Sequence, residues 1–419
     1  MVYLRKIVYL CSMILRAYRY RIYPNVEQKI LIAKHFGSCR WLWNHTLNRK
    51  IEAYAKDKTH LSRFDLQKEI PSLKKTEETK WLKEVNSQSL QSTLENQDKA
   101  FTKFFREKKG FPKFKAKRNE QSFQCPQNAK VDFEGGKLLL PKFKQGIKTV
   151  FHREFEGKVK TTTIRQKASG KYYVSILVET TKTEKSPKKP NIKKSIGIDL
   201  GIKDFIITSN GEKIANQKYL KKSLKRLKRL QRWQSRKIKG SNGRNKSRII
   251  LAKQHEKVTN QRLDFLHKIT HQLVCENQAT SFCIEDLNVK GMLRNHNLAQ
   301  SISDVSWSKF VELLQYKSRW VGKNVIRIGR WEASSKTCSH CGAVNKTLTL
   351  SNREWTCADC GTMHDRDVNA AKNILHFAFH PKNNHKQIGQ ELSESTLMEN
   401  GVHRKVSRSL KSEAPIPLG

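Results

Sequence analysis

The sequence predicts an α+β fold with several domains. In the first half, short strand-like segments lie on both sides of a long helical block, and in the second half apolar strands alternate with helices. Near the end, two pairs of cysteines have the spacing of a small metal-binding insert. A chain of 419 residues has room for two or three domains, each with its own core.

The first half is expected to be a β-barrel or sandwich that a helical block interrupts. Residues 15–23 mix apolar and basic side chains in a strand-like pattern, which Pro24 ends. A helical pattern then continues to about residue 108. From 121 to 181 the chain returns to short apolar segments separated by glycine-containing turns. The charged, proline-containing segment 182–194 is expected to be a linker between domains.

The second half opens with an apolar strand at 195–200 and a hairpin whose turn is Asn210–Gly211. One long basic helix is expected at 218–248, because leucines recur there at three- and four-residue steps. The remaining expected elements are a helix at about 250–276, a strand at 281–287, a helix at 304–321, a strand at 324–329 and a helix at 367–379. Residues after about 380 are polar and aperiodic, and we expect a disordered tail.

The charge balance predicts a large polyanionic partner. The chain has 83 Lys and Arg against 37 Asp and Glu, which gives a formal net charge of +46. Nucleic acid is favoured over a membrane surface, and no apolar run reaches the ~18–20 residues that span a bilayer. Five of the nine cysteines are scattered in apolar contexts and read as buried thiols, which favours a reducing, intracellular setting.

The other four cysteines form the strongest local pattern. Cys338 and Cys341 make one Cys-x-x-Cys pair, and Cys357 and Cys360 make a second pair after fifteen intervening residues. This spacing is typical of a zinc ribbon, in which each pair supplies two thiolates from one tight turn. Four thiolates fill a tetrahedral site, so the sequence predicts one structural Zn²⁺ with no open position for catalysis.

Three acids interrupt apolar elements or stand at their ends: Asp199, Glu285 and Asp367. A buried carboxylate is costly unless it is paired or holds a metal, so together they suggest a shared Mg²⁺ site. Taken alone, Asp199 is as well explained by hydrogen bonds from backbone amides. The neighbouring acids are expected at the surface or at helix ends: Asp204, Asp286 and Asp365.

Two basic segments are candidates for contact with nucleic acid. Residues 218–248 contain fourteen Lys or Arg and no acid, which favours contact with a polyanion over a merely solvated surface. In the second segment, Phe111 and Phe114 stand among lysines; this permits base stacking but also fits a plain loop. The candidate contact residues are Lys225, Arg226, Lys228, Arg229, Arg232, Lys113 and Lys115.

Three motifs, in this order, resemble the TnpB proteins of bacterial insertion sequences, which are related to the type V CRISPR effector nucleases. They are SIGIDLGIKDF, CIEDLNVKGM and HDRDVNAAKNIL, with the four-cysteine insert before the third. The similarity covers about residues 13–380. Each motif alone is weak, but the ordered set is specific to the family.

The resemblance implies a wedge-type β-barrel with an inserted helical recognition block, followed by a RuvC-like nuclease domain of ribonuclease H fold with an inserted zinc ribbon. The implied boundaries are 1–24 and 121–190 for the barrel, 25–120 for the helical insert, 191–337 and 361–382 for the nuclease domain, 338–360 for the zinc ribbon and 383–419 for the tail.

The resemblance further implies RNA-guided cleavage of DNA next to a short transposon-associated motif. Asp199, Glu285 and Asp367 match the family's three RuvC acids, and they would bind two Mg²⁺ ions for phosphodiester hydrolysis. The implied partners are a guide RNA from the protein's own locus and double-stranded target DNA, in the cytoplasm of a bacterium or archaeon and associated with the nucleoid. The alternatives are a nuclease-inactive, RNA-guided DNA-binding regulator and an accessory protein of transposition; the intact acid triad argues against the first.

Overall fold

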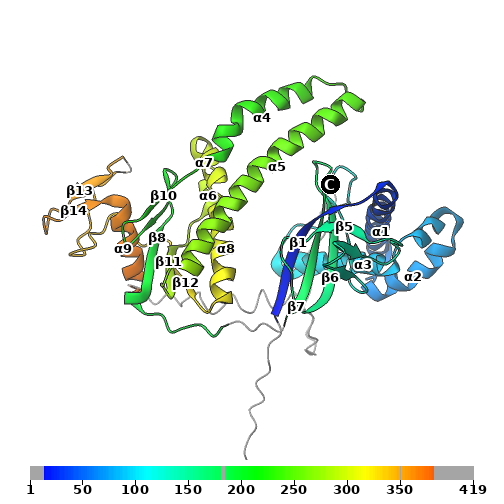
Figure 1. Cartoon of the computed structure of the whole chain (residues 1–419), viewed down its shortest axis with the longest axis horizontal. Coiled ribbons are helices and arrows are strands. Elements are labelled where there is room, and N and C mark those ends of the chain that lie inside the picture. Colours follow the sequence, from blue (N-terminus) through cyan, green and yellow to red (C-terminus); the bar gives the residue numbers. More distant parts are fainter. Residues whose placement is uncertain (1–13, 181–184, 350, 382–419) are drawn as a thin grey trace, which may run out of the picture. The chain divides into compact units, whose positions relative to one another are not determined.

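The computed structural model describes residues 14–180, 185–349 and 351–381. The chain divides into two compact units, one made of Met1–Glu184 with Lys222–Gln261, the other of Lys185–Lys221 with Arg262–Gly419 (Figure 1). The expected tail at 383–419, the first twelve residues and part of the expected linker lie outside the described residues. None of the described helices combines the length and the apolar character that a membrane crossing requires.

The first unit contains a seven-stranded antiparallel sheet with the order β2-β6-β7-β1-β5-β4-β3. Its longest ladder joins β1 to β7, from the pair Ile14 and Thr180 to the pair Ile22 and Tyr172. The sheet thus unites the expected strand at 15–23 with strands from the 121–181 segment. The strands are β1 (Ile14–Tyr23), β2 (Gln121–Cys125), β3 (Lys130–Asp132), β4 (Lys137–Leu139), β5 (Ile147–Val150), β6 (Lys158–Gln166) and β7 (Tyr172–Thr180).

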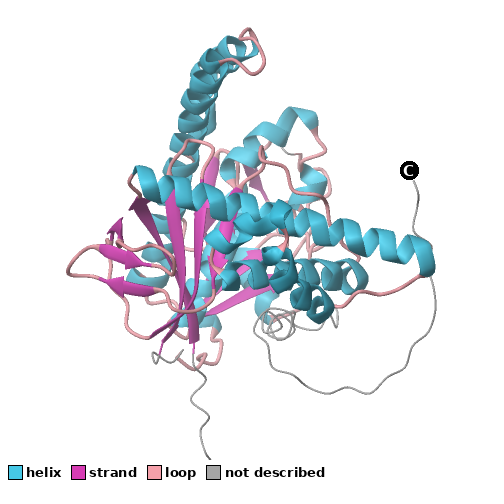
Figure 2. Ribbon diagram, turned by 90° about the vertical axis from the view of Figure 1, so that its right-hand side faces the viewer, coloured by secondary structure: helices cyan, strands magenta, loops and turns pink. Residues whose placement is uncertain are grey.

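Helices between β1 and β2 supply the rest of this core. Asn25 begins α1 with a capping box, in which its side chain accepts from the Gln28 amide and the Gln28 side chain accepts in return. Ser62 and Asp65 begin α2 in the same way. The elements are α1 (Val26–Asp57), α2 (Arg63–Lys75), the 3₁₀ helix η1 (Glu77–Glu84) and α3 (Ser87–Glu107) (Figure 1). Figure 2 shows the described helices and strands of the chain from a second side, coloured by type.

The sheet of the first unit is open, whereas the sequence predicted a barrel or sandwich. Its strand order ends at β2 and at β3, and no ladder joins these two strands in the described residues. Helices α1 and α3 pack against β2, and the rings of Phe36 and Phe123 lie 5.7 Å apart there. The apolar surface at this end of the sheet is therefore buried by helices and not by a closing strand.

The expected single helix at 218–248 is two helices, α4 (Tyr219–Ser235) and α5 (Asn242–His271). Gly240 adopts a φ of +86° between them, a conformation that suits glycine. The Arg244 guanidinium donates to the carbonyl oxygens of Gln234 and Lys237, at 3.2 and 2.7 Å. These bonds satisfy carbonyl groups where α4 ends, and the chain turns back at this point.

The second unit is built on a five-stranded sheet with the order β10-β9-β8-β11-β12. The strands β8, β11 and β12 run parallel, while β9 and β10 continue the sheet in antiparallel pairs. Gly211, with a φ of +88°, lies in the turn between β9 and β10, which confirms the expected hairpin. The strands are β8 (Ser195–Asp199), β9 (Asp204–Thr208), β10 (Lys213–Ala215), β11 (Ser281–Glu285) and β12 (Asn324–Ile328).

Helices cover both faces of this sheet. Ile198 and Ile284 pack on one face with Leu266 of α5 and Phe310 of α8. On the other face Cys283 packs with residues of α9, including Ile374 and Phe377. The remaining elements of this unit are η2 (Ile192–Lys194), the π-helical turn η3 (Gln272–Glu276), α6 (Val289–Met292), α7 (His296–Val305), α8 (Trp307–Trp320), β13 (Glu354–Thr356), β14 (Met363–Asp365) and α9 (Arg366–Phe379).

Candidate functional site

Two of the predicted acids end neighbouring parallel strands of the second unit. Ile198 of β8 pairs with Ile284 of β11, so Asp199 and Glu285, the next residues, lie side by side at the carboxyl edge of the sheet. Successive side chains in a strand point to opposite faces. Because Ile198 and Ile284 face α8, both acids point to the face that α9 covers. Ligand sites in open α/β sheets lie at this carboxyl edge.

The third acid reaches the same place from α9. A Cβ atom built on Gly197 would lie only 2.0 Å from the Ala371 carbonyl oxygen and 2.9 Å from the Leu375 amide nitrogen. The backbone of α9 therefore rests directly on β8, in a contact that only glycine allows. Asp367 stands in the first turn of α9, one helical turn before Ala371. This packing places Asp367 close enough to Asp199 for their charges to interact.

The carboxyl of Asp199 lies in an environment that opposes its ionisation. Burial, followed by the charges of Glu285 and Asp367, raises its pKa from 3.8 to about 7. Burial also raises the pKa of Glu285, although the Ser334 hydroxyl donates a hydrogen bond to that carboxylate and opposes the effect. Clustered, desolvated carboxyl groups of this kind gain most from a bound cation, which offsets both burial and mutual repulsion.

The two acids of the DRD sequence have different surroundings. Asp367 forms ion pairs with Arg353 at 3.1 Å and with Arg366 at 3.2 Å. Asp365 is the N-cap of α9 and accepts from the amides of Asp367 and Val368, both at 3.0 Å. Lys213 of β10 pairs with the second oxygen of Asp365 at 2.5 Å. Partial burial acts to raise the pKa of Asp365, but Lys213 and these amides together lower it. The expected capping role of Asp365 is confirmed.

The four predicted cysteines come together as the second feature of this unit. The sulfur atoms of Cys338, Cys341, Cys357 and Cys360 all lie within 4.8 Å of one another. Gly342 and Gly361 follow the two pairs with φ values of +81° and +70°, so each pair closes a tight turn. Four thiolates from two such turns fit a tetrahedral Zn²⁺ site. The oxygens of the three acids do not form a group this compact within the described residues.

Polar contacts join the cysteine cluster to α9. The Asn369 side chain donates to the Thr337 carbonyl at 2.8 Å and accepts from the Ser339 amide at 2.9 Å. One turn later, the Asn373 side chain donates to the carbonyls of Ser334 and Thr337, at 2.7 and 2.6 Å. Since Ser334 also donates to Glu285, one hydrogen-bonded path connects the first cysteine turn to the acids. These hydrogen bonds attach the first half of α9, which carries Asp367, to the segment that contains the first cysteine pair.

The candidate nucleic-acid contacts are exposed on α4, whereas two candidates in the loop after α3 also pack within the chain. On α4, all five predicted basic residues are exposed while Leu227 is buried, as the leucine spacing predicted. In the loop after α3, the Lys115 ammonium lies 3.7 Å from the centre of the Trp43 ring, and burial lowers its pKa. Phe111 meets Phe101 edge-on at 5.5 Å, whereas Phe114 is 53% exposed. Lys115 and Phe111 therefore have packing roles within the chain.

Sequence reasoning missed three residues that position the acids: Gly197, Ser334 and Lys213. Gly197 had a readable signal, because a glycine inside an apolar strand often marks a close backbone approach. Ser334 and Lys213 act on acids 49 and 152 positions away in the sequence. No local pattern marks such contacts.

The geometry defines a class of protein: a mixed α/β protein with a carboxylate cluster at a sheet edge and an adjoining four-thiolate site. Family models match three segments: residues 13–59 with a model described as "Helix-turn-helix domain", 175–296 with "Probable transposase" and 307–374 with "Cas12f1-like, TNB domain". In the first segment, the described residues form one strand and one long helix, β1 and α1, and not a helix-turn-helix.

Curated relatives cover most of the chain. A Streptomyces pristinaespiralis protein named "Putative RNA-guided DNA endonuclease" is 38% identical, over 86% of this chain and 88% of its own length. The Escherichia coli K12 protein "Putative RNA-guided DNA endonuclease InsQ" is 31% identical, over 86% and 92%. The chain therefore belongs to the TnpB family of insertion-sequence RNA-guided DNA endonucleases. A solved structure, "Cryo-EM structure of the Cas12f1-sgRNA-target DNA complex", is 14% identical with a TM-score of 0.47, covering 87% of this chain and 99% of that chain.

Proposed function

We propose that this protein is an RNA-guided DNA endonuclease that hydrolyses phosphodiester bonds with a RuvC-type, Mg²⁺-dependent site. The observation that carries the proposal is the meeting of Asp199, Glu285 and Asp367 at one sheet edge, with the pKa of Asp199 raised to about 7. A protein that only binds DNA has no need for three clustered acids, two of which, Asp199 and Glu285, are desolvated. A nuclease-inactive regulator is therefore the weaker interpretation.

We assign the domains with the boundaries that the family resemblance implies. Residues 191–337 and 361–382 are the ribonuclease H-like nuclease domain. Its sheet supports this assignment: β10, β9 and β8 are neighbours in antiparallel pairs, and β11 and β12 continue the sheet parallel to β8. Residues 338–360 are its zinc ribbon. We assign the wedge role to residues 1–24 and 121–190 and the recognition role to the helices of 25–120. The open sheet in this region is compatible with a surface that nucleic acid covers.

In this mechanism, the three acids would hold two Mg²⁺ ions, which stabilise the attacking and leaving oxygens of the phosphodiester when bound. The protein's own residues set the positions of the acids. Ser334 orients Glu285 through a hydrogen bond, and Gly197 lets α9 bring Asp367 to β8. Asp365 and Lys213 fix the start of α9. Arg353 and Arg366 neutralise Asp367 and offer cations beside the site where the phosphate would bind.

Sequence recognition would come from a bound RNA. The basic residues of α4 contact phosphates, which carry no sequence information. Base pairing between a guide RNA and the target strand supplies the specificity, while the protein reads a short flanking duplex motif. The exposed residues Lys225, Arg226, Lys228, Arg229 and Arg232 are the proposed phosphate contacts, together with Lys113.

The test compares acid variants for cleavage and binding. Glu285→Gln and Asp367→Asn are expected to reduce cleavage at least about 100-fold with little change in DNA affinity, because a metal ligand acts mainly on the transition state. Asp365→Asn is the matched control and is expected to keep most activity, because asparagine can still accept the hydrogen bonds that cap α9. Full cleavage by Glu285→Gln, measured on a plasmid with protein and RNA held constant, would refute the proposed site.

A further inference from the structure

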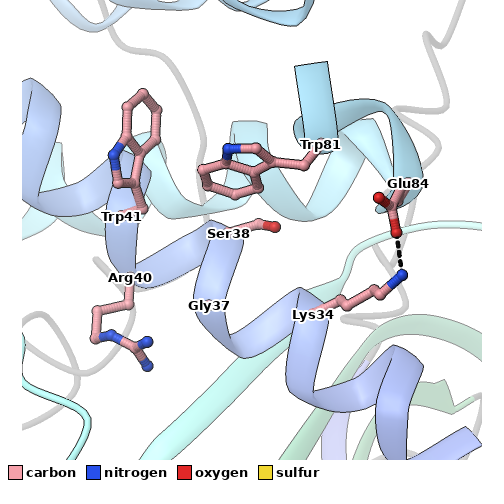
Figure 3. Close-up of a pocket in the computed structure, with 7 residues that line it drawn as sticks. All are labelled: Lys34, Gly37, Ser38, Arg40, Trp41, Trp81 and Glu84. Atoms are coloured by element: carbon pink, nitrogen blue, oxygen red, sulfur yellow. Dashed lines mark hydrogen bonds and ion pairs between the residues drawn. The ribbon is translucent and has the colours of Figure 1, made fainter. Parts of the chain in front are cut away.

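The first unit has a second feature that the proposed cleavage chemistry does not use. A hollow of about 420 Å³ opens on α1, opposite the 3₁₀ helix η1. Its walls include Trp41 and Arg40 at one end, Trp81 in the middle and the Lys34–Glu84 ion pair at the other end (Figure 3). Gly37 and Ser38 of α1 form its floor. The hollow thus presents two indole rings, with the Arg40 guanidinium at one end and a paired lysine and glutamate at the other.

The two indole rings are held in place before any ligand binds. The Trp81 Nε1–H group donates to the Glu78 carbonyl oxygen at 2.9 Å, which fixes the ring above α1. Trp41 meets Trp81 edge-on at 5.4 Å and stacks on His45 at 4.7 Å with nearly parallel planes. Rings fixed in this way lose little conformational entropy when a flat ligand inserts, so the site is preorganised.

Gly37 leaves the floor of the hollow without a side chain, although glycine lowers the stability of helix α1. It lies inside the 32-residue helix α1, and its backbone is not in the left-handed region. A Cβ atom at this position would meet nothing within 4 Å. Neither packing nor backbone conformation therefore requires glycine here, and glycine inside a helix is less favourable than alanine. The consequence of having glycine is that the floor of the hollow stays open beneath the Trp81 ring.

We propose that this hollow binds one unpaired nucleobase, stacked on Trp81 above Gly37, from the nucleic acid that the protein holds. Aromatic side chains stack on bases of every kind, which suits a protein that must accept many sequences. The Arg40 guanidinium is held by Gln121 at 2.5 Å and has further N–H groups for a phosphate beside the base. The net charge of +46 favours a polyanionic ligand over a neutral aromatic one.

This inference rests on the proposed function, because it requires a bound single strand. The base could come from the guide RNA or from a displaced DNA strand, which share a flat base joined to a phosphate backbone. The probe is a short oligonucleotide with one 2-aminopurine in an otherwise abasic backbone, prepared as RNA and as DNA. Stacking quenches 2-aminopurine fluorescence, while the anisotropy of an end label reports total binding.

The variants are chosen so that loss of folding cannot imitate the result. Gly37→Ala places a methyl group on the floor of the hollow, in the space proposed for the base, and is expected to leave the melting temperature unchanged or raised. It should abolish quenching and weaken binding of the probe by at least about five-fold. Trp81→Ala should do the same. Ala55→Ser, which adds one atom at an exposed position of α1 outside the hollow, is the matched control and should change neither signal.

The outcomes separate this inference from the proposed function. Wild-type protein should bind the single-base probe at least about five-fold more tightly than a fully abasic one, and Gly37→Ala should remove that difference. A larger effect with the RNA probe assigns the base to the guide, and a larger effect with the DNA probe assigns it to a DNA strand. Unchanged quenching by Gly37→Ala and Trp81→Ala, with binding intact, would overturn the inference alone. Absence of probe binding by the wild type, with binding of RNA from its own locus intact, would also overturn the inference alone; loss of both would overturn the proposed function as well.

Discussion

Replacing Asp199 by asparagine is expected to stabilise the metal-free protein while it removes cleavage activity. The pKa of Asp199 lies near 7 in the folded protein, against an ordinary value of 3.8, because burial, Glu285 and Asp367 oppose ionisation. The folded chain therefore binds this proton more tightly than the unfolded chain, and stability is lost as the pH rises from about 4 to about 7. Asparagine has no charge to lose or gain, so the variant escapes this penalty.

The size of the effect follows from the two pKa values. Each pH unit between them is worth about 1.4 kcal/mol, which sets an upper bound of about 4 kcal/mol above pH 7. Relaxation of the surrounding structure and entry of water weaken such effects even at buried sites, so we expect roughly 2 kcal/mol of this bound. For a unit of this size, that corresponds to a rise in melting temperature of about 4–8 °C.

The assay is thermal unfolding of wild type and Asp199→Asn in chelator, at pH values of about 4 and about 8. The variant should melt higher only at the upper pH, and Mg²⁺ should raise the melting temperature of the wild type more than that of the variant. Asp286→Asn is the control, since Asp286 is a half-buried neighbour whose charge is paired with Arg330 at 2.6 Å. Equal melting temperatures of wild type and Asp199→Asn at the upper pH would refute the reasoning.

Three further predictions concern the contact of α9 with β8, the zinc site and a buried histidine of the first unit. Gly197→Ala should displace α9 from β8, destabilise the protein by about 1–3 kcal/mol or more and remove cleavage; a variant with wild-type melting and activity would contradict the packing argument. Elemental analysis should find about one zinc per chain, and the Cys357→Ser/Cys360→Ser double variant should lose it together with thermal stability; full metal content in that variant would exclude the site. Burial lowers the pKa of His35, which accepts from the Asn86 amide, so stability should fall as the pH drops below 6.5; His35→Gln should show a weaker fall, and an equal fall in both proteins would exclude this residue as its cause.

Much of the local structure could be predicted from the sequence because it depends on neighbouring residues. The apolar strand that ends at Asp199, the hairpin turn at Gly211 and the cap of α9 by Asp365 all have short-range signals. The four cysteines were equally readable, since metal geometry restricts their spacing. In each case, the physical constraint acts within a few positions of the chain.

The features that escaped prediction depend on contacts between distant segments. The end of α4 is set by Arg244, which satisfies carbonyl groups that helix periodicity alone does not mark. Whether a sheet closes is decided by what covers its edge, and here α1 and α3 bury β2. The approach of α9 to β8 needs both Gly197 and Ala371, which are far apart in the sequence. Such pairs become visible only when the fold brings them together.

The central claim is that a bound RNA directs the cleavage, and it can be tested by exchanging the guide. The protein is stripped of RNA and reconstituted with RNA from its own locus in which the guide segment has been replaced. Cleavage should then move to a plasmid that matches the new segment and carries the flanking motif, and it should be absent without RNA. Equal cutting with and without RNA would contradict the account and leave an unguided, metal-dependent nuclease in its place.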